Sequence, residues 1–239
     1  MRKLISLLVL LVMASGLAFA LSRRPIGARA AMRQGRLDEE KVNFGRRYNS
    51  RGVEDTGAAN IVASVVVTYR SFDTLGEVTV LFIAATGLAA LLYTEKGRQP
   101  RHEAEPASLI VFTGCRFLFP LILLFGAYIF IYGHLTPGGG FQGGAIVASG
   151  FLLICLGCRG RSLSIGRLSA TESLSGLLFV VIGLIGLSVG GSFLLDFLPK
   201  GTPYALLSAG VIPIIYILIG LKVGSELAGV IANLAGEAR

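Results

Sequence analysis

The chain has 239 residues, of which 53% are hydrophobic and only 15% are charged, and its mean hydropathy is +0.72. This composition excludes a disordered chain and a soluble nucleic-acid-binding domain, and it indicates a protein of the lipid bilayer. The basic residues behind the net charge of +8 lie between apolar blocks, where lysine and arginine orient membrane helices, so they do not indicate a polyanion partner.

Apolar runs long enough to cross a bilayer occur six times along the chain. A helical crossing requires about 20 residues, with a range of about 17 to 25. The runs cover residues 4–21, 76–93, 109–132, 141–158, 173–195 and 202–221. A helix satisfies its own backbone hydrogen bonds in lipid, so we predict an all-α, polytopic membrane protein with about six transmembrane helices.

The first run, residues 4–21, has two interpretations. The basic residues Arg2 and Lys3 before it and the Ala-Phe-Ala sequence at positions 18–20 are also typical of a cleaved signal peptide. The length of the apolar block favours a retained helix. The sequence leaves open whether this helix is retained or cleaved.

Basic residues between the runs predict an orientation. If the N-terminus is inside, the two short outside loops contain only Lys200, whereas the short inside segments contain Arg2, Lys3, Lys96, Arg98, Arg101, Arg159, Arg161, Arg167, Lys222 and Arg239. We therefore predict a multi-pass protein of the cell membrane with cytoplasmic N- and C-termini. The Arg-rich residues 22–56 break this pattern, because they lie outside in this topology, so their side and role stay open.

A polar stretch divides the chain into two unlike halves. The predicted organisation is a transmembrane helix at 1–21, an Arg-rich extramembrane segment at 22–56, a segment with one transmembrane helix at 57–93, a polar linker at 94–108 and a four-helix membrane domain at 109–239. Residues 57–69 are too short to span the bilayer comfortably. We predict that they form a short helix at the interface or against partner subunits.

Arg70, Asp73 and Glu77 lie at the mouth of the second predicted helix. Asp73 and Thr74 can cap its first turn, and Glu77 sits at the positive end of the helix dipole. The residues after Glu77 are almost entirely apolar, which places its carboxylate at or below the lipid headgroups, where an ionisable group usually faces a polar cavity. Both capping and a functional or partner-facing role are open for Glu77.

A glycine-rich sequence at residues 133–144 joins two predicted helices. It contains His134, Pro137, Gly138, Gly139, Gly140, Gly143 and Gly144. The proline and glycines end one helix and allow close backbone approach at the next. No Lys-Ser/Thr pair follows the glycines and no strand precedes them, which excludes a phosphate-binding loop. His134 is either a hydrogen-bonded cap or a proton carrier.

Lys222 and Glu226 stand four residues apart on one helix face, at the end of the last predicted span. A wetted pair of this kind only anchors the helix, whereas a pair drawn into the membrane against another subunit can belong to an ion relay. Arg116 and Glu172 also flank spans, and we predict that they are snorkelling anchors. Pro213 is predicted to bend the last helix.

Cys155 and Cys158 have the C-x-x-C spacing of redox sites and of half a zinc site. No second pair and no nearby histidine accompany them, so we interpret them as small apolar filler. The sequence also contains no nucleophile beside a base, no metal-ligand cluster and no cofactor motif. We therefore expect no catalytic residues, no metal and no cofactor in this chain, and no enzyme activity of its own.

Two strings resemble known families. Tyr-Arg-Ser-Phe-Asp-Thr-Leu-Gly-Glu at positions 69–77 resembles the E subunit of energy-converting membrane-bound hydrogenases and the equivalent C-terminal part of the large Mrp antiporter subunit. Gly-His at 133–134, Pro-Gly-Gly-Gly-Phe at 137–141, Gly-Gly at 143–144 and the string at 220–227 resemble the MnhB/MrpB family, the B subunit of the multisubunit Na+/H+ antiporter. The Arg-rich residues 23–57 depart from the Pro-rich stretch expected of the family.

The resemblance implies a non-catalytic membrane subunit of an Mrp-type cation/proton antiporter or of a related membrane-bound hydrogenase. Its partners would be the other subunits of such a complex and the lipid bilayer, with Na+ and H+ as transported ions. It implies that Glu77 faces the ion path and that Asp73, Arg70, His134, Lys222 and Glu226 are secondary members. A purely architectural scaffold is the alternative. The exchanged cation, and the choice between a stand-alone antiporter and a redox-driven complex, stay open.

Overall fold

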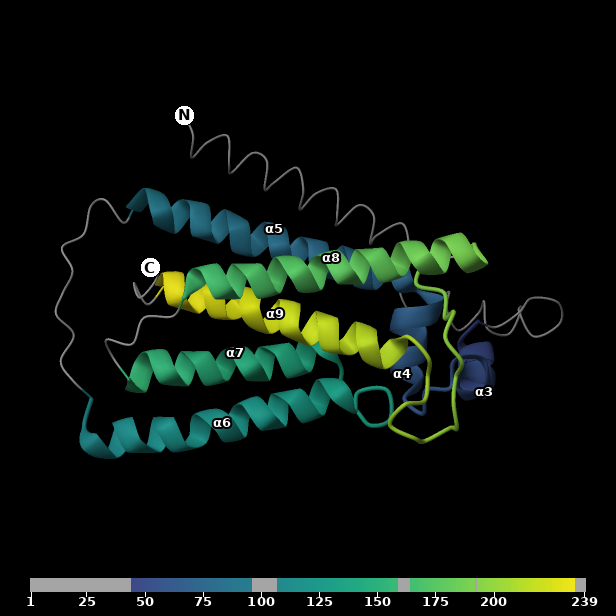
Figure 1. Cartoon of the computed structure of the whole chain (residues 1–239), viewed down its shortest axis with the longest axis horizontal. Helices are drawn as coiled ribbons and strands as arrows, with labels where there is room; N and C mark the ends of the chain where they lie inside the picture. The colour runs from purple at the N-terminus through teal and green to yellow at the C-terminus, as the bar shows by residue number, and fades with distance from the viewer. Residues whose placement is uncertain (1–43, 96–106, 159–163, 192, 235–239) are drawn as a thin grey trace, which may run out of the picture. The chain divides into compact units, whose positions relative to one another are not determined.

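The computed structural model describes residues 44–95, 107–158, 164–191 and 193–234, and the chain within these ranges is helical without strands. The helices are α3 (Phe44–Thr56), α4 (Ile61–Ala63), the π-helix η1 (Ser64–Tyr69), α5 (Ser71–Glu95), α6 (Leu109–Ile131), α7 (Gly140–Gly157), α8 (Ile165–Gly190) and α9 (Ile212–Leu234) (Figure 1). The chain divides into two compact units, Met1–Arg47 and Tyr48–Arg239, and the second contains all helices from α4 onward. The predicted all-α class is confirmed.

Five of the described helices, α5 to α9, are long and apolar enough to cross a membrane. In number and order they correspond to the last five of the six predicted crossings, and they support the predicted multi-pass protein. The sixth, at residues 4–21, and most of the Arg-rich segment 22–56 lie outside the described residues. The orientation of the two termini stays a prediction.

The last two predicted spans are misplaced. α8 begins at Ile165 instead of the predicted residue 173, and α9 begins at Ile212 instead of residue 202. Residues 193–211 form a loop, in which Asp196 Oδ1 accepts a hydrogen bond from the Val211 N–H at 3.0 Å. Pro213 is the second residue of α9, where no intrahelical N–H donor is needed, so it does not bend the helix as predicted.

α9 is the central helix of the second unit. It contacts α5, α6, α7 and α8, and it is the most buried of the five long helices. The colour gradient shows that α8 runs antiparallel to α9, whereas α5 runs in the same direction as α9 (Figure 1). Most side chains at the centre of α9 are therefore buried against other helices, whereas Leu221 is exposed.

Glycines allow α7 and α9 to approach closely. Gly140, Gly143 and Gly144 are buried on α7, at the end of the glycine-rich sequence. A methyl group at Gly144 would lie 2.8 Å from Val223 Cβ and 2.9 Å from the Gly220 carbonyl oxygen, closer than atoms can pack. Close packing through glycine is typical of membrane helices, because it brings two backbones into van der Waals contact.

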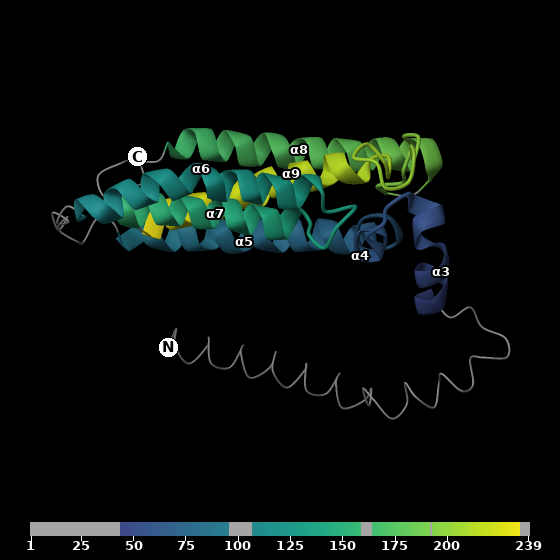
Figure 2. The same cartoon turned by 90° about the horizontal axis from the view of Figure 1, so that it is seen from below.

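Asn60 joins the beginning of α4 to the loop between α6 and α7. Its amide donates hydrogen bonds to the carbonyls of Gly133 and Thr136, at 2.8 and 3.0 Å. Its side-chain oxygen accepts from Val62 and Ala63 and so caps α4. Both views place α4 and η1 at the same end of the long helices as this loop (Figures 1 and 2). Two segments far apart in sequence are therefore held together there.

The start of α5 differs from the predicted capping arrangement. Residues 61–69 are helical, as predicted for a short helix, but α5 already begins at Ser71. The Thr74 hydroxyl donates to the Val66 carbonyl of η1 at 2.8 Å, so it ties α5 to the preceding π-helix instead of capping α5. Asp73 pairs with Arg70 on the exposed surface and does not act as an N-cap.

Candidate functional site

Lys222 and Glu226 form a buried ion pair inside α9. The Lys222 Nζ lies 2.8 Å from Glu226 Oε2, and only 8% and 1% of the two side chains are exposed. Glu226 Oε1 is also buried and has no hydrogen-bond partner within the described part of the chain. The pair therefore is not the wetted anchor that one interpretation of the sequence predicted. The sequence shows the four-residue spacing that allows Lys222 and Glu226 to pair. The last span was predicted to begin and end too early, however, so the pair was expected at the end of a helix.

The position of the pair is close to the middle of a membrane span. Lys222 is ten residues beyond Ile212, which corresponds to about 15 Å at about 1.5 Å per residue. A hydrocarbon core is about 30 Å thick, so a crossing by the whole of α9 would place Lys222 near its centre. Charged groups at this depth are costly, and they usually face the interior of a bundle, where they mark ion or proton pathways.

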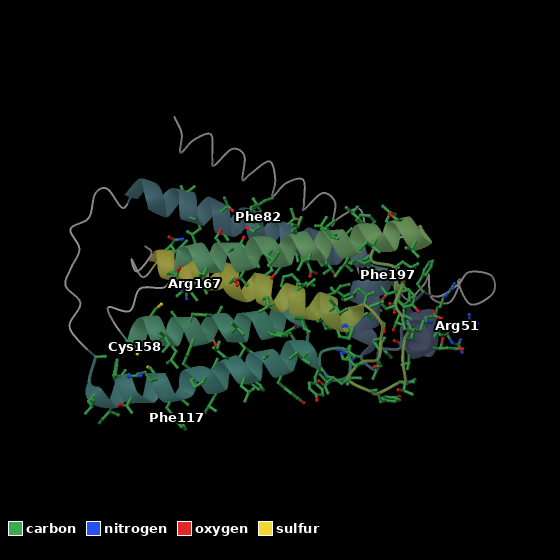
Figure 3. The ribbon with its side chains drawn as sticks, viewed as in Figure 1. Arg51, Phe82, Phe117, Cys158, Arg167 and Phe197 are labelled. Carbon is green, nitrogen blue, oxygen red and sulfur yellow. The ribbon has the colours of Figure 1, made fainter. Side chains whose placement is uncertain are left out.

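Neighbouring helices complete the surroundings of the pair. Lys222 Nζ lies 5.3 Å from the ring centre of Phe82, a cation–π contact that the sequence did not reveal. Phe82 is labelled on α5 in Figure 3. On α8, Gly176 faces the Lys222 stem, because a methyl group there would lie 3.4 Å from Lys222 Cε. Three helices thus build one polar position inside an otherwise apolar unit. Contacts between residues of different helices, such as these, cannot be recognised from hydropathy or from the spacing of residues in a motif.

The predicted site residues at the start of α5 and just before it lie apart from this pair. Arg70 and Asp73 form an exposed ion pair. Glu77 is exposed on α5, and it makes no hydrogen bond or ion pair with any described residue. An exposed carboxylate inside a membrane span requires water or a partner subunit, because lipid cannot solvate it. The structure therefore does not bring Glu77 together with Lys222 and Glu226.

His134 lies in the loop between α6 and α7 and is completely buried. Burial lowers the pKa of its imidazole below the usual 6.5, and the nearby backbone of Ala205, Ile131 and Leu206 only partly opposes this effect. Neither ring nitrogen has a partner with hydrogen-bonding geometry among the described residues. The cap and proton-carrier roles of the ring both stay predictions; the His134 carbonyl accepts a hydrogen bond from the Asn60 N–H at 3.0 Å.

The three cysteines are buried. Cys115 of α6 and Cys158 at the end of α7 pack with Ile154 and with the partly buried Phe119 and Leu153. No group of three or more His, Cys, Asp or Glu residues that could hold a metal ion occurs in the described ranges. Cys115 and Cys158 therefore contribute to apolar packing between α6 and α7 in the structure.

A family model described as a domain related to the MnhB subunit of the Na+/H+ antiporter matches residues 110–229, half of the chain. This chain belongs to that family. A second model, MbhE, described as the E subunit of MBH, matches residues 4–105. That match includes the Arg-rich segment, which the sequence alone had set apart as a departure from the family. The two matches confirm the predicted resemblance on both sides of the polar linker.

Relatives and solved structures extend the match. An uncharacterized protein of Methanocaldococcus jannaschii is 32% identical over 194 residues, which are 71% of this chain and 74% of the relative. A chain of an archaeal respiratory membrane complex, the membrane-bound sulfane sulfur reductase, is 45% identical with a TM-score of 0.74, and the match covers 98% of this chain and 97% of that chain.

A chain of the Mrp complex from Dietzia sp. DQ12-45-1b is 28% identical with a TM-score of 0.68. The match covers 99% of this chain but only 26% of the Mrp chain, so this protein corresponds to about a quarter of it. The MnhB-family chain is thus a membrane subunit of the cation-antiporter type of complex. Its partners are other subunits of such an assembly.

Proposed function

We propose that this MnhB-family subunit helps to form the ion path of a cation/proton antiporter module, and that Lys222 and Glu226 belong to that path. The buried ion pair in α9 carries the proposal. A buried pair is weak evidence for a role in stability, because removing two charges from water costs about as much as their attraction returns. A role in moving ions gives a reason for placing the pair at this depth.

Two features support a path and not an isolated charge. The pair is enclosed by α5, α8 and α9, so an ion that reaches it is shielded from lipid. Glu77 and Asp73 on α5, and Arg70 just before it, are exposed, so a neighbouring subunit can cover them. We include these three residues as the part of the path that faces a partner, with Na+ and H+ as the exchanged ions.

Antiport by Glu226→Gln and Glu77→Gln complexes tests this function. We expect both complexes to assemble, Glu226→Gln with reduced stability because Lys222 loses its buried partner. Both should lose most of their Na+-driven proton movement in vesicles, because the amide cannot exchange a proton or attract a cation. Glu54→Gln is the matched control, since Glu54 is an exposed acid on α3, and it should retain wild-type antiport. Full antiport by assembled Glu226→Gln would indicate the alternative, a purely architectural scaffold.

We also infer that the assembly is redox-driven. The 45% identity to a respiratory-complex chain, over nearly the full length of both chains, supports this more strongly than the 28% identity to the Mrp chain. The subunit should then copurify with redox subunits when the complex is extracted in mild detergent and its proteins are identified by mass spectrometry. A particle that contains only small membrane antiporter subunits would contradict this inference.

A further inference from the structure

Glu172 of α8 lies opposite Glu226 of α9, although the sequence predicted only a snorkelling anchor for it. α8 and α9 are antiparallel (Figure 1), and a methyl group at Gly176 would lie 3.4 Å from Lys222 Cε. One helical turn towards the start of α8 leads from Gly176 to Glu172, and one turn towards the end of α9 leads from Lys222 to Glu226. In antiparallel helices these two steps have the same direction. The register therefore places the two carboxylates face to face.

Electrostatics agrees with this register. Glu172 is partly buried, and it interacts electrostatically with both Glu226 and Lys222. It is seven residues beyond Ile165, whereas Glu226 is eight residues before Leu234, so both acids lie at about the same depth of about 10–12 Å from the same end of the helices. Arg167, nearer that end, is exposed and is labelled in Figure 3.

The group as a whole lacks one positive charge. Two carboxylates share one ammonium, and Glu226 Oε1, which is buried, has no hydrogen-bond partner in the ranges that the structure describes. Like charges at one buried position cannot both remain ionised without compensation. One proton or one monovalent cation bound to the carboxylate oxygens supplies the missing charge.

Other charged groups of the surrounding helices do not supply it. α7 contains no charged residue. Asp73 and Glu77 of α5 and Arg116 of α6 are exposed in the described structure. Among the side chains of these helices whose burial the structure describes, the charged residues that are buried or partly buried are therefore the acidic pair and Lys222, beside the uncharged phenol of Tyr216 and the thiols of Cys115, Cys155 and Cys158.

We propose that Glu172 and Glu226 form one site at which a proton and a monovalent cation compete, with Lys222 as its fixed positive charge. The inference rests on the proposed function and specifies the ligand of the same site. When the proton leaves, the two carboxylates together with Lys222 carry one net negative charge, and a cation binds through their oxygens. When a proton returns, the net charge becomes zero and the cation leaves. Occupancy by either ion, but not both, is the condition for exchange.

Na+ titrations of the intact complex in vesicles, repeated over a series of pH values, test this site. For the wild type, the half-saturating Na+ concentration should fall as the pH rises, because fewer protons compete. Glu172→Gln should raise this concentration about tenfold or more and remove its pH dependence, since Lys222 then balances the remaining carboxylate. Glu172→Asp should retain the pH dependence. Ser173→Ala, at an exposed neighbouring position of α8, is the matched control and should behave as wild type.

Each outcome decides between the proposals. If Glu226→Gln abolishes antiport but Glu172→Gln keeps the wild-type pH dependence, the shared site is wrong and the ion path stands. If Glu226→Gln retains full antiport, the path itself is wrong. Loss of assembly by Glu172→Gln would also contradict the shared site, because removing one of two repelling charges should leave the complex at least as stable as the wild type. A K+ titration in parallel identifies which cation competes with the proton.

Discussion

Replacing Lys222 with Met is expected to lower the free energy of unfolding by about 3–5 kcal/mol, because it leaves Glu226 buried without its counter-charge. Lys222→Met/Glu226→Leu should recover most of this loss, since both charges are then replaced by apolar groups of similar length. For stability, each of the two charges would thus be needed only to compensate the other. The measurements are the thermal unfolding of the purified complex in detergent and the fraction of the subunit that is assembled.

The exposed pair of Arg70 and Asp73 is the control for Lys222→Met. Its side chains are 61% and 48% exposed, and exposed pairs contribute about 0–1 kcal/mol. Arg70→Met should therefore change unfolding little, although it removes the same type of charge. If Lys222→Met is no more destabilising than Arg70→Met, the pair is not buried in the assembled complex and this description of α9 is wrong.

Gly144→Ala is expected to destabilise the contact between α7 and α9. The added methyl group meets Val223 Cβ at 2.8 Å and the Gly220 carbonyl oxygen at 2.9 Å, and neither belongs to the far end of a flexible side chain. The two helices must separate, which costs about 1–3 kcal/mol, and Gly144→Val should cost more. Thermal unfolding and the yield of assembled complex measure the effect.

Gly114→Ala in α6 separates this packing effect from the general effect of adding a methyl group. A methyl group at Gly114 meets nothing within 4 Å. Alanine also favours a helix over glycine by about 1 kcal/mol, so Gly114→Ala should be neutral or stabilising. Equal unfolding temperatures for Gly144→Ala and Gly114→Ala would contradict the close approach of α7 and α9.

The bounds of α6 and α7 could be predicted closely from the sequence, because uninterrupted apolar runs between polar segments define them. The bounds of α8 and α9 could not, because apolar residues of the loop between them, such as Phe193 and Leu194, read as membrane helix. In the structure these side chains are buried against other parts of the unit. Hydropathy reports that a side chain avoids water, but it does not distinguish a lipid-facing helix from a buried loop.

Because the bounds of α8 and α9 were predicted wrongly, most of the candidate site could not be recognised from the sequence. The four-residue spacing of Lys222 and Glu226 predicts an ion pair from the sequence, but their depth depends on where α9 begins. Glu172 and Phe82 come from other helices, and only the register of α8 and the packing of α5 bring them to Lys222. For Glu77 the sequence predicted a costly carboxylate near the membrane, and the structure adds that it is exposed and so available to a partner.

Antiport by the Lys222→Met/Glu226→Leu complex tests the central claim most directly. This variant removes both charges of the buried pair, and the carboxylate that remains, Glu172, is only partly buried, so no fully buried charge is left unpaired. We predict that the complex assembles with near-normal stability but no longer exchanges Na+ for protons in vesicles. Wild-type exchange by the assembled double variant would show that the pair is not in the ion path.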